Sequence, residues 1–299
     1  MGIAEVIPGV SGGTIAFITG IYEKLLNTIK VFLTPDTWSH ILQRKFTLFW
    51  QSIHGSFLSK LLLGMIGGLV FGVLFFTYLL ESFPILIWAF FFGLIISSSF
   101  YIGRKVKSWS LIQVFVLLIG TSIAYGITLL NPGGGSSSLL FVFFSGMIAI
   151  SALILPGISG SFILLLMGMY PIILGAAKSV LTDFNSENLL LLSIFALGCL
   201  TGLALFSRIL SYAFSNFPNN TLALLTGFML GSLPKIWPWR TVLETRINSK
   251  GEEVPFLEKP IFPMDYPGDP MIFGALITFL GGILLVLIFS YLEKNFRHS

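Results

Sequence analysis

The chain has 299 residues, of which 55% are hydrophobic and only 10% are charged, and its formal net charge is +4. A soluble globular protein carries about 25% charged residues, so this chain lacks the polar groups to cover a water-exposed surface, and the soluble class is excluded. Unbroken apolar runs such as residues 61–80 also exclude a transmembrane β-barrel, because barrel strands alternate apolar and polar residues. The composition therefore predicts an all-α polytopic membrane protein.

The N-terminal stretch, residues 1–30, is apolar but is interrupted at Pro8-Gly9. Proline removes a helical hydrogen bond and glycine frees the backbone, so we expect two half-helices that form a re-entrant hairpin. The half-helix ahead of the break is expected to be shortened, because few residues precede it. A polar loop at residues 31–60 is expected next. Three apolar runs that are nearly or fully long enough to cross a membrane follow, at 61–80, 85–103 and 110–130.

The same order of elements recurs in the second half of the chain. Residues 131–138 (NPGGGSSS) have the composition of a flexible linker. An apolar stretch at 139–177, interrupted at Pro156-Gly157, predicts a second re-entrant hairpin. Three further apolar runs are expected to cross the membrane, and a polar, proline-rich loop at 235–270 separates the last two. These runs are 189–214, 219–234 and 271–292.

The two broken stretches are similar in sequence. Residues 8–22 and 156–170 are identical at seven of 15 positions. We interpret this similarity as a duplication, with residues 1–130 as the first repeat and residues 139–299 as the second. Each repeat then crosses the membrane an odd number of times, so the repeats are inverted and their hairpin tips can meet near the midplane, as in secondary transporters. If the hairpins span the membrane fully, the repeats are parallel instead.

The distribution of basic residues predicts the orientation of the chain. With re-entrant hairpins, eleven of the 17 Lys and Arg residues fall on the side of loop 31–60, and six fall on the opposite side. Loops rich in Lys and Arg remain in the cytoplasm. Loop 31–60 and the C-terminus are therefore expected to be cytoplasmic, and loop 235–270 extracytoplasmic.

Each Pro-Gly break is followed by a helix start that is rich in glycine and hydroxyl groups. These residues are Ser11, Gly12, Gly13 and Thr14 after the first break and Ser159, Gly160 and Ser161 after the second. A helix N-terminus presents unpaired N–H groups and a partial positive charge, so two such tips favour an anion with several acceptor oxygens, such as a phosphate. The ordinary alternative is that Ser and Thr cap the helices and the small residues let helices approach closely.

Three ionisable residues in or beside apolar segments are candidates for function, because charges at membrane depth are costly. Glu5, just before the first break, is a candidate carrier of a coupling proton, unless it is a terminal residue that reaches water. Glu23 is a second such candidate at the cytoplasmic mouth, or else a solvated charge at a helix end. Arg208 interrupts an apolar run and suits a phosphate, unless its side chain snorkels to the cytoplasmic interface.

Enzyme chemistry has little support in the sequence. It contains no HExxH motif, nucleophile elbow or Walker A motif, and its histidines lie outside the apolar segments. No catalytic residue, metal site or cofactor is therefore expected. Because no ATP-binding motif is found, uphill transport is expected to use an ion gradient, of protons or of sodium ions.

Residues 2–14 (GIAEVIPGVSGGT), with residues 20–23 (GIYE) after them, resemble the signature of a prokaryotic membrane family now assigned as polyprenyl-phosphate transporters and formerly a domain of unknown function. Residues 155–161 (LPGISGS) resemble the second motif of that family. The resemblance covers essentially the whole chain. It implies a flippase in the bacterial cytoplasmic (inner) membrane that returns undecaprenyl phosphate, the lipid carrier of cell-wall precursors, from the outer to the cytoplasmic leaflet.

Other functions remain open at this point. A channel or transporter for a small soluble anion is the main alternative, and it calls for a closed aqueous pore rather than a groove open to lipid. A phosphatase acting on the same lipid is a third hypothesis, which the positions of the histidines argue against. The expected partners are the lipid phosphate, membrane lipids and a coupling ion, without nucleic acid, and the chain is expected as a monomer or a homodimer.

Overall fold

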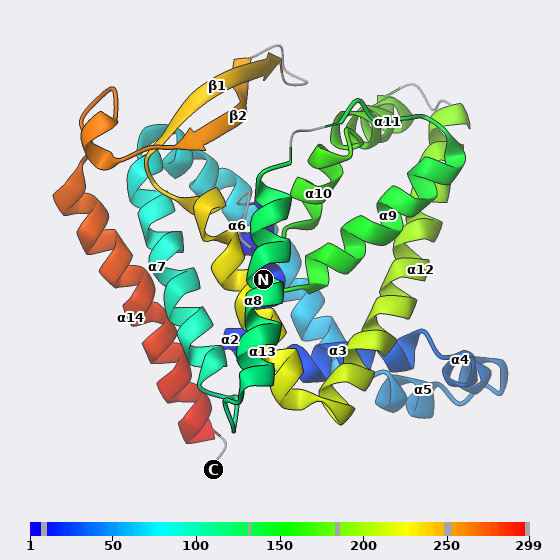
Figure 1. Ribbon diagram of the computed structural model, residues 1–299. Helices are drawn as coiled ribbons and strands as arrows, with labels where there is room; N and C mark the ends of the chain where they lie inside the picture. The colour runs from blue at the N-terminus through cyan, green and yellow to red at the C-terminus, as the bar shows by residue number, and fades with distance from the viewer. Residues whose placement is uncertain (7–10, 131–132, 183–185, 248–252, 297–299) are drawn as a thin grey trace.

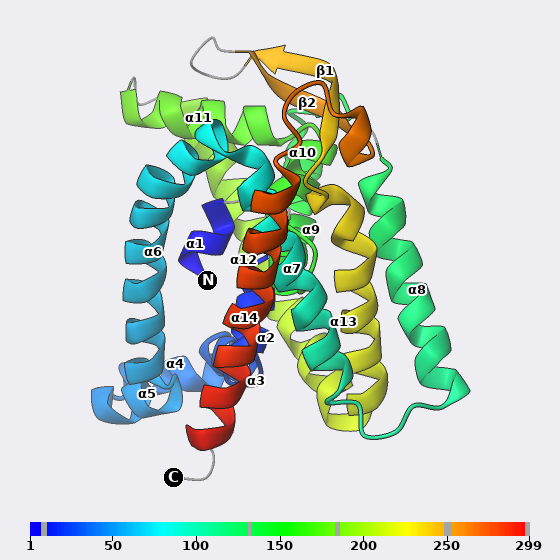
Figure 2. The same cartoon turned by 90° about the vertical axis from the view of Figure 1, so that its left-hand side faces the viewer.

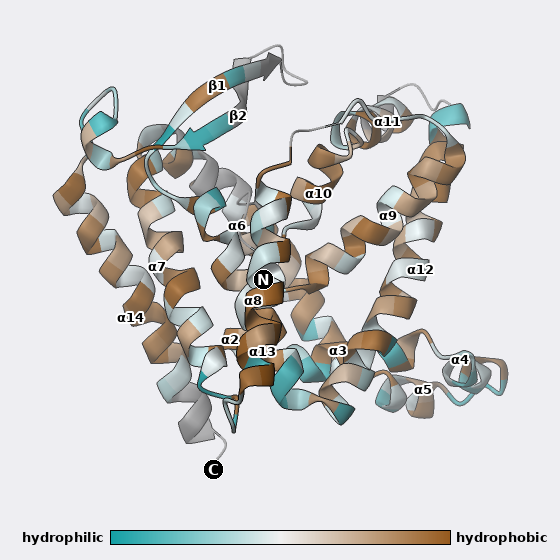
Figure 3. Ribbon diagram, viewed as in Figure 1, coloured by the Kyte–Doolittle hydropathy of each residue, from teal (hydrophilic) through white to brown (hydrophobic). Residues whose placement is uncertain are grey.

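A computed structural model describes residues 1–6, 11–130, 133–182, 186–247 and 253–296, and this part of the chain is mostly helical. Five helices within it are long and apolar enough to cross a membrane. They are α6 (Gly55–Ser82), α7 (Pro84–Gly103), α8 (Leu111–Thr128), α12 (Ser186–Asn216) and α14 (Ile272–Phe296). Figure 1 shows them running between the same two ends of the molecule, and Figure 3 shows how apolar they are. The prediction of a helical, multi-pass membrane protein is confirmed.

The N-terminal segment forms three short helices, α1 (Gly2–Val6), α2 (Gly12–Ile18) and α3 (Tyr22–Phe32). The expected break at Pro8-Gly9 lies outside the described residues. α1 packs beside α6 at about half its height, and α2 leads from there toward the lower end of the molecule, where α3 follows (Figure 2). The first half of the chain therefore places the start of α2 deep inside the molecule.

The segment expected as a loop at residues 31–60 is mostly helical, which corrects that prediction. It contains α4 (Pro35–Leu42) and α5 (Phe46–Ser52). Large apolar side chains of these helices, including Phe46 and Trp50, are exposed. Amphipathic helices of this kind lie in the plane of a membrane surface with their apolar side chains in the lipid. The sequence did not reveal them because seven or eight residues are too few to show a clear helical period.

The second broken stretch forms α9 (Leu139–Ile154), α10 (Gly160–Leu166) and α11 (Tyr170–Thr182). From the break between them, α9 and α10 both extend toward the upper end of the molecule in Figure 1. α10 and α11 are bent relative to each other by 108°. Gly157 in the break has a φ of +86°, a conformation that favours glycine, and a Cβ there would lie 2.8 Å from the Cα of Met229.

Three pairs of helices make the most extensive packing: α7 with α14, α8 with α13 (Pro218–Ser232), and α9 with α12. Small residues let the backbones touch in these pairs. In the second pair, a Cβ on Gly227 would lie 2.3 Å from the carbonyl oxygen of Leu117. Membrane helices associate through such close contacts because lipid provides no hydrophobic driving force between them. The buried core, which includes Ile95 and Leu225, lies where these helices meet.

The segment expected as a loop at residues 235–270 is also partly ordered. After the 3₁₀ turn η1 (Leu233–Ile236), it forms an antiparallel hairpin of β1 (Arg240–Ile247) and β2 (Glu253–Pro260) at the upper end of the molecule. A second 3₁₀ turn, η2 (Pro263–Asp265), leads to α14. The protein is therefore not purely α-helical. β1 is rich in β-branched residues, which favour strands, but the prolines of this segment obscured that pattern.

Candidate functional site

The start of α2 is fastened to the end of α9 by Ser11. Ser11 is the N-cap of α2, and its Oγ accepts a hydrogen bond from the N–H of Gly13 at 3.0 Å. The same buried hydroxyl donates to the carbonyl oxygen of Leu155 at 2.9 Å, and the carbonyl oxygen of Leu153 lies 3.3 Å away. The last carbonyls of a helix have no partner within that helix. The C-terminal end of α9 therefore provides acceptors for a side chain from the first half of the chain.

Two other buried hydroxyl groups connect the first half of the chain to the same place. The Oγ1 of Thr14 accepts a hydrogen bond from the N–H of Gly157 at 3.2 Å. The hydroxyl of Tyr22 donates to the carbonyl oxygen of Ile154 at 3.1 Å. We call the contact formed by Ser11, Thr14 and Tyr22 with residues 153–157 the clasp. It brings the start of α2 and the second Pro-Gly break together.

The glycines after the breaks allow close contacts within the protein itself. A Cβ on Gly13 would lie 2.4 Å from the carbonyl oxygen of Ile154, so the clasp has no room for any larger side chain. A Cβ on Gly160 would lie 2.6 Å from the carbonyl oxygen of Ala149, which keeps α10 tight against α9. Packing alone therefore accounts for glycine at these two positions.

Glu5 occupies the N-terminus of α2. Its Oε1 accepts a hydrogen bond from the N–H of Gly12 at 3.0 Å, and a Cβ on Gly12 would lie 2.3 Å from that oxygen. A helix N-terminus attracts negative charge through its free N–H groups and its dipole. The protein's own carboxylate is therefore bound where the sequence predicted that an external anion would bind.

At the second break, the hydroxyl groups contact each other. The Oγ atoms of Ser159 and Ser161 are 2.9 Å apart. Ser159 has an extended backbone, as an N-cap residue does, but its side chain makes no capping hydrogen bond to α10. The start of α10 thus differs from the start of α2, where Ser11 caps the helix and Glu5 binds the next N–H.

Two of the predicted site residues are not part of the clasp. Glu23 is exposed and lines a cavity of about 190 Å³ with Asn27 and Ser211. Arg208 is exposed on α12, although the preceding Ser207 is fully buried. Successive residues of a helix are about 100° apart around its axis, so Arg208 points outward while its neighbour points inward. The structure therefore brings neither residue to the clasp.

Tyr22 is the clasp residue that sequence reasoning missed. The signal was available, because a Gly-x-Tyr sequence follows each break, at residues 20–22 and again at 168–170.

We expect Tyr22→Phe to lower the free energy of unfolding by about 0.5–1.5 kcal/mol, because it removes one hydrogen bond of a buried carbonyl. Thermal unfolding of the purified protein measures this change. Tyr212→Phe is the matched control. Tyr212 is exposed, so loss of its hydroxyl group should leave the unfolding midpoint unchanged.

Comparisons with known proteins agree with the motif resemblance. The family model described as undecaprenyl phosphate translocase-like matches residues 1–254. A polyprenyl-phosphate transporter of Vibrio cholerae is 42% identical, over 98% of this chain and 94% of the relative. A polyprenyl-phosphate transporter of Staphylococcus aureus is 36% identical, over 80% of this chain and 83% of the relative. No solved structure matches the chain significantly. The chain belongs to the undecaprenyl phosphate translocase-like family.

Proposed function

We propose that this protein is a secondary transporter, a flippase that returns undecaprenyl phosphate from the outer to the cytoplasmic leaflet of the bacterial inner membrane. The names of the family and of both relatives support a polyprenyl phosphate as the substrate, and they support a transporter rather than an enzyme. Transport measurements under imposed ion gradients test the direction of transport and the use of an ion gradient.

The packing of the helices supports an arrangement as two inverted repeats. In the order of the repeats, α7 corresponds to α13 and α8 to α14, so the pairs α7–α14 and α8–α13 are equivalent. Phe83 and Phe217, which directly precede the equivalent helices α7 and α13, have nearly the same backbone angles. α7 begins at the upper end of the molecule, whereas α13 begins at the lower end (Figure 1). Inverted repeats with broken helices are the architecture of many secondary transporters.

The main support for the proposal is the contact between the two halves of the chain at the clasp, together with the hydrogen bond that the carboxylate of Glu5 accepts from the N–H of Gly12. In the proposed cycle, a phosphate oxygen of the substrate replaces this carboxylate, and the displaced Glu5 takes up the coupling proton. Ser11 and Thr14 already bind residues of the second break, so their hydroxyls reach the phosphate only when the start of α2 separates from that break. The proposed phosphate site comprises Ser11, Gly12, Gly13, Thr14, Ser159, Gly160 and Ser161.

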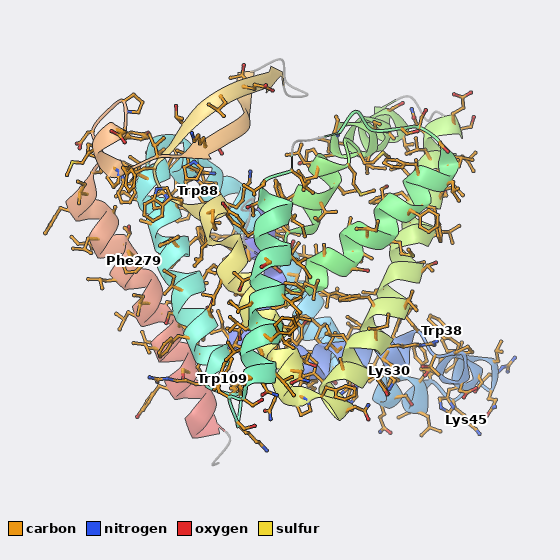
Figure 4. The ribbon with its side chains drawn as sticks, viewed as in Figure 1. Lys30, Trp38, Lys45, Trp88, Trp109 and Phe279 are labelled. Carbon is orange, nitrogen blue, oxygen red and sulfur yellow. The ribbon has the colours of Figure 1, made fainter. Side chains whose placement is uncertain are left out.

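The lower end of the molecule in Figure 1 is proposed to face the cytoplasm. Figure 4 places Lys30, Lys45 and Trp109 at this end. Lys and Arg favour the cytoplasmic side, and tryptophans favour the two membrane–water interfaces. Trp88 lies at the opposite end, near the hairpin of β1 and β2, which is then extracytoplasmic. With this orientation, the exposed Arg208 lies two turns from the cytoplasmic end of α12, at Asn216, within reach of lipid head groups.

Reconstitution into liposomes tests the proposal. Undecaprenyl phosphate is placed in one leaflet, and its appearance in the other leaflet is followed in the presence of a proton or a sodium gradient. We expect movement of the lipid phosphate, and none of undecaprenol, which has the same chain without the phosphate. Transport of inorganic phosphate but not of the lipid would contradict the proposal and favour a small-anion transporter.

A further inference from the structure

A cavity of about 260 Å³ lies at the upper end of the molecule, beneath the hairpin of β1 and β2, and none of its lining residues belongs to the clasp. Its lining combines three basic side chains, one acidic side chain and apolar residues from α8 and α10. The charged members are Lys235, Arg240, Lys259 and Glu258. Pockets that enclose a whole drug-sized ligand measure about 300–1,000 Å³, so this cavity suits a head group rather than a complete lipid.

Lys235 is the half-buried cation of this cavity. Its Nζ lies 4.5 Å from the centroid of the Phe162 ring, and no carboxylate of the described residues lies within ion-pair distance of it. An ammonium group has three hydrogen-bond donors, and an aromatic face does not satisfy them. Burial disfavours the charged form and lowers the pKa of Lys235 below its usual range. An anion bound in the cavity would supply the missing acceptors and stabilise the charge.

Arg240, in contrast, is already engaged within the protein. Its Nη1 donates to Glu258 at 2.8 Å and lies 3.3 Å from the carbonyl oxygen of Lys235, and its guanidinium stacks over the ring of Trp88 at 4.1 Å. This ion pair uses the acidic side chain that lines the cavity. The excess positive charge of the cavity therefore belongs to Lys235 and, at the exposed rim, to Lys259.

The mouth of the cavity is apolar and exposed. Leu129 and Leu130, which directly follow α8, and Leu243 from β1 are more than half exposed. In a membrane protein, such side chains face lipid. A ligand with an anionic head and an apolar chain therefore fits: the head lies at Lys235, and the chain leaves the cavity over the leucines into the outer leaflet.

The cavity is also close to the second break. Phe162 of its lining directly follows Ser161, and α10 rises by about 1.5 Å per residue, so the whole helix is only about 10 Å long. A head group at Lys235 therefore lies about one helix length from Ser159 and Ser161.

We infer that the cavity at Lys235 binds the phosphate head group of a lipid phosphate in the outer leaflet, before that head group moves to the clasp. This inference rests on the proposed function for the identity of the substrate. The site itself would bind any phosphate monoester, so both lipid-linked and free phosphate must be tested.

Residue-specific labelling tests the site directly. An amine-reactive reagent is applied to the purified full-length protein in detergent, and modification of each lysine is read by mass spectrometry. Undecaprenyl phosphate should reduce the modification of Lys235 severalfold and leave that of Lys45, at the opposite end of the molecule, unchanged. Undecaprenol should protect neither lysine. If inorganic phosphate protects Lys235 and the lipid phosphate does not, the inference of a lipid site is wrong.

Binding affinity provides the second test. Lys235→Gln should weaken binding of undecaprenyl phosphate about tenfold or more, as expected for loss of a charge-assisted hydrogen bond. Lys235→Arg should restore most of the affinity, and Lys45→Gln should bind as the unaltered protein does. The inference would be overturned if Lys235→Gln bound undecaprenyl phosphate as tightly as the unaltered protein and if this lipid did not protect Lys235 from the amine-reactive reagent. Neither measurement depends on transport, so a chain that binds at Lys235 but moves no lipid contradicts only the proposed function.

Discussion

Gly13→Ala is expected to abolish transport and to destabilise the protein. The added Cβ would lie 2.4 Å from the carbonyl oxygen of Ile154, which is a backbone atom and cannot rotate away. The start of α2 must then move from the end of α9, and the hydrogen bonds of Ser11 and Thr14 to the second break are lost with it. Overpacking of this kind costs about 1–3 kcal/mol. Lipid-phosphate transport in liposomes should fall at least tenfold, and thermal unfolding in detergent measures the loss of stability.

Gly64→Ala is the matched control for this change. Gly64 also lies in a helix, α6, but a Cβ there would meet nothing within 4 Å. Alanine in place of an exposed helical glycine stabilises a helix by about 0.5–1 kcal/mol, so the two variants should shift the unfolding midpoint in opposite directions. Full transport by Gly13→Ala would show that the tight contact at the clasp is not needed for function.

The sequence predicted the start of α2 better than the contacts that join it to the second break. The repeated Pro-Gly motifs indicated two broken helices, and Ser11 and Thr14 were correctly placed at the start of a helix. Their partners could not be predicted, because they are backbone carbonyl and N–H groups of residues 153–157, and such groups occur along the whole chain. Only the packing of α9 decides which of its terminal carbonyls face the first half of the chain.

Arg208 illustrates the limit of reasoning from charge alone. A charge within an apolar run suggested either a phosphate-binding residue or a side chain that snorkels to the interface. The side of the helix on which Arg208 lies could not be read from a sequence that is apolar on nearly all sides. The same difficulty concealed the cavity at Lys235. Its lining comes from α8, from α10 and from the segment of η1 and the β-hairpin, which lie far apart in the chain and share no motif that links them.

Glu5→Gln is expected to uncouple transport from the proton gradient. Glutamine has nearly the same shape as glutamate, and its side-chain oxygen can still accept the hydrogen bond from the N–H of Gly12. It cannot take up or release a proton. If displacement of the Glu5 carboxylate by the substrate phosphate is the coupled step, the variant should still equilibrate undecaprenyl phosphate between the leaflets. Accumulation against a concentration difference, driven by a pH gradient, should fall at least tenfold.

Two further variants distinguish Glu5 from Glu23 as the residue that carries the coupling proton. Asp36→Asn changes an exposed carboxylate on α4 and should accumulate the lipid as the unaltered protein does. Glu23→Gln removes the other candidate, which is not part of the clasp and lines a separate cavity. Loss of gradient-driven accumulation in Glu23→Gln alone would move the coupling step to that cavity. The carboxylate of Glu5 accepts the hydrogen bond from the N–H that the phosphate is proposed to bind. Coupling at Glu5 therefore requires the proton and the phosphate to exchange at the same helix end. Coupling at Glu23 instead requires a conformational change that links its cavity to the clasp.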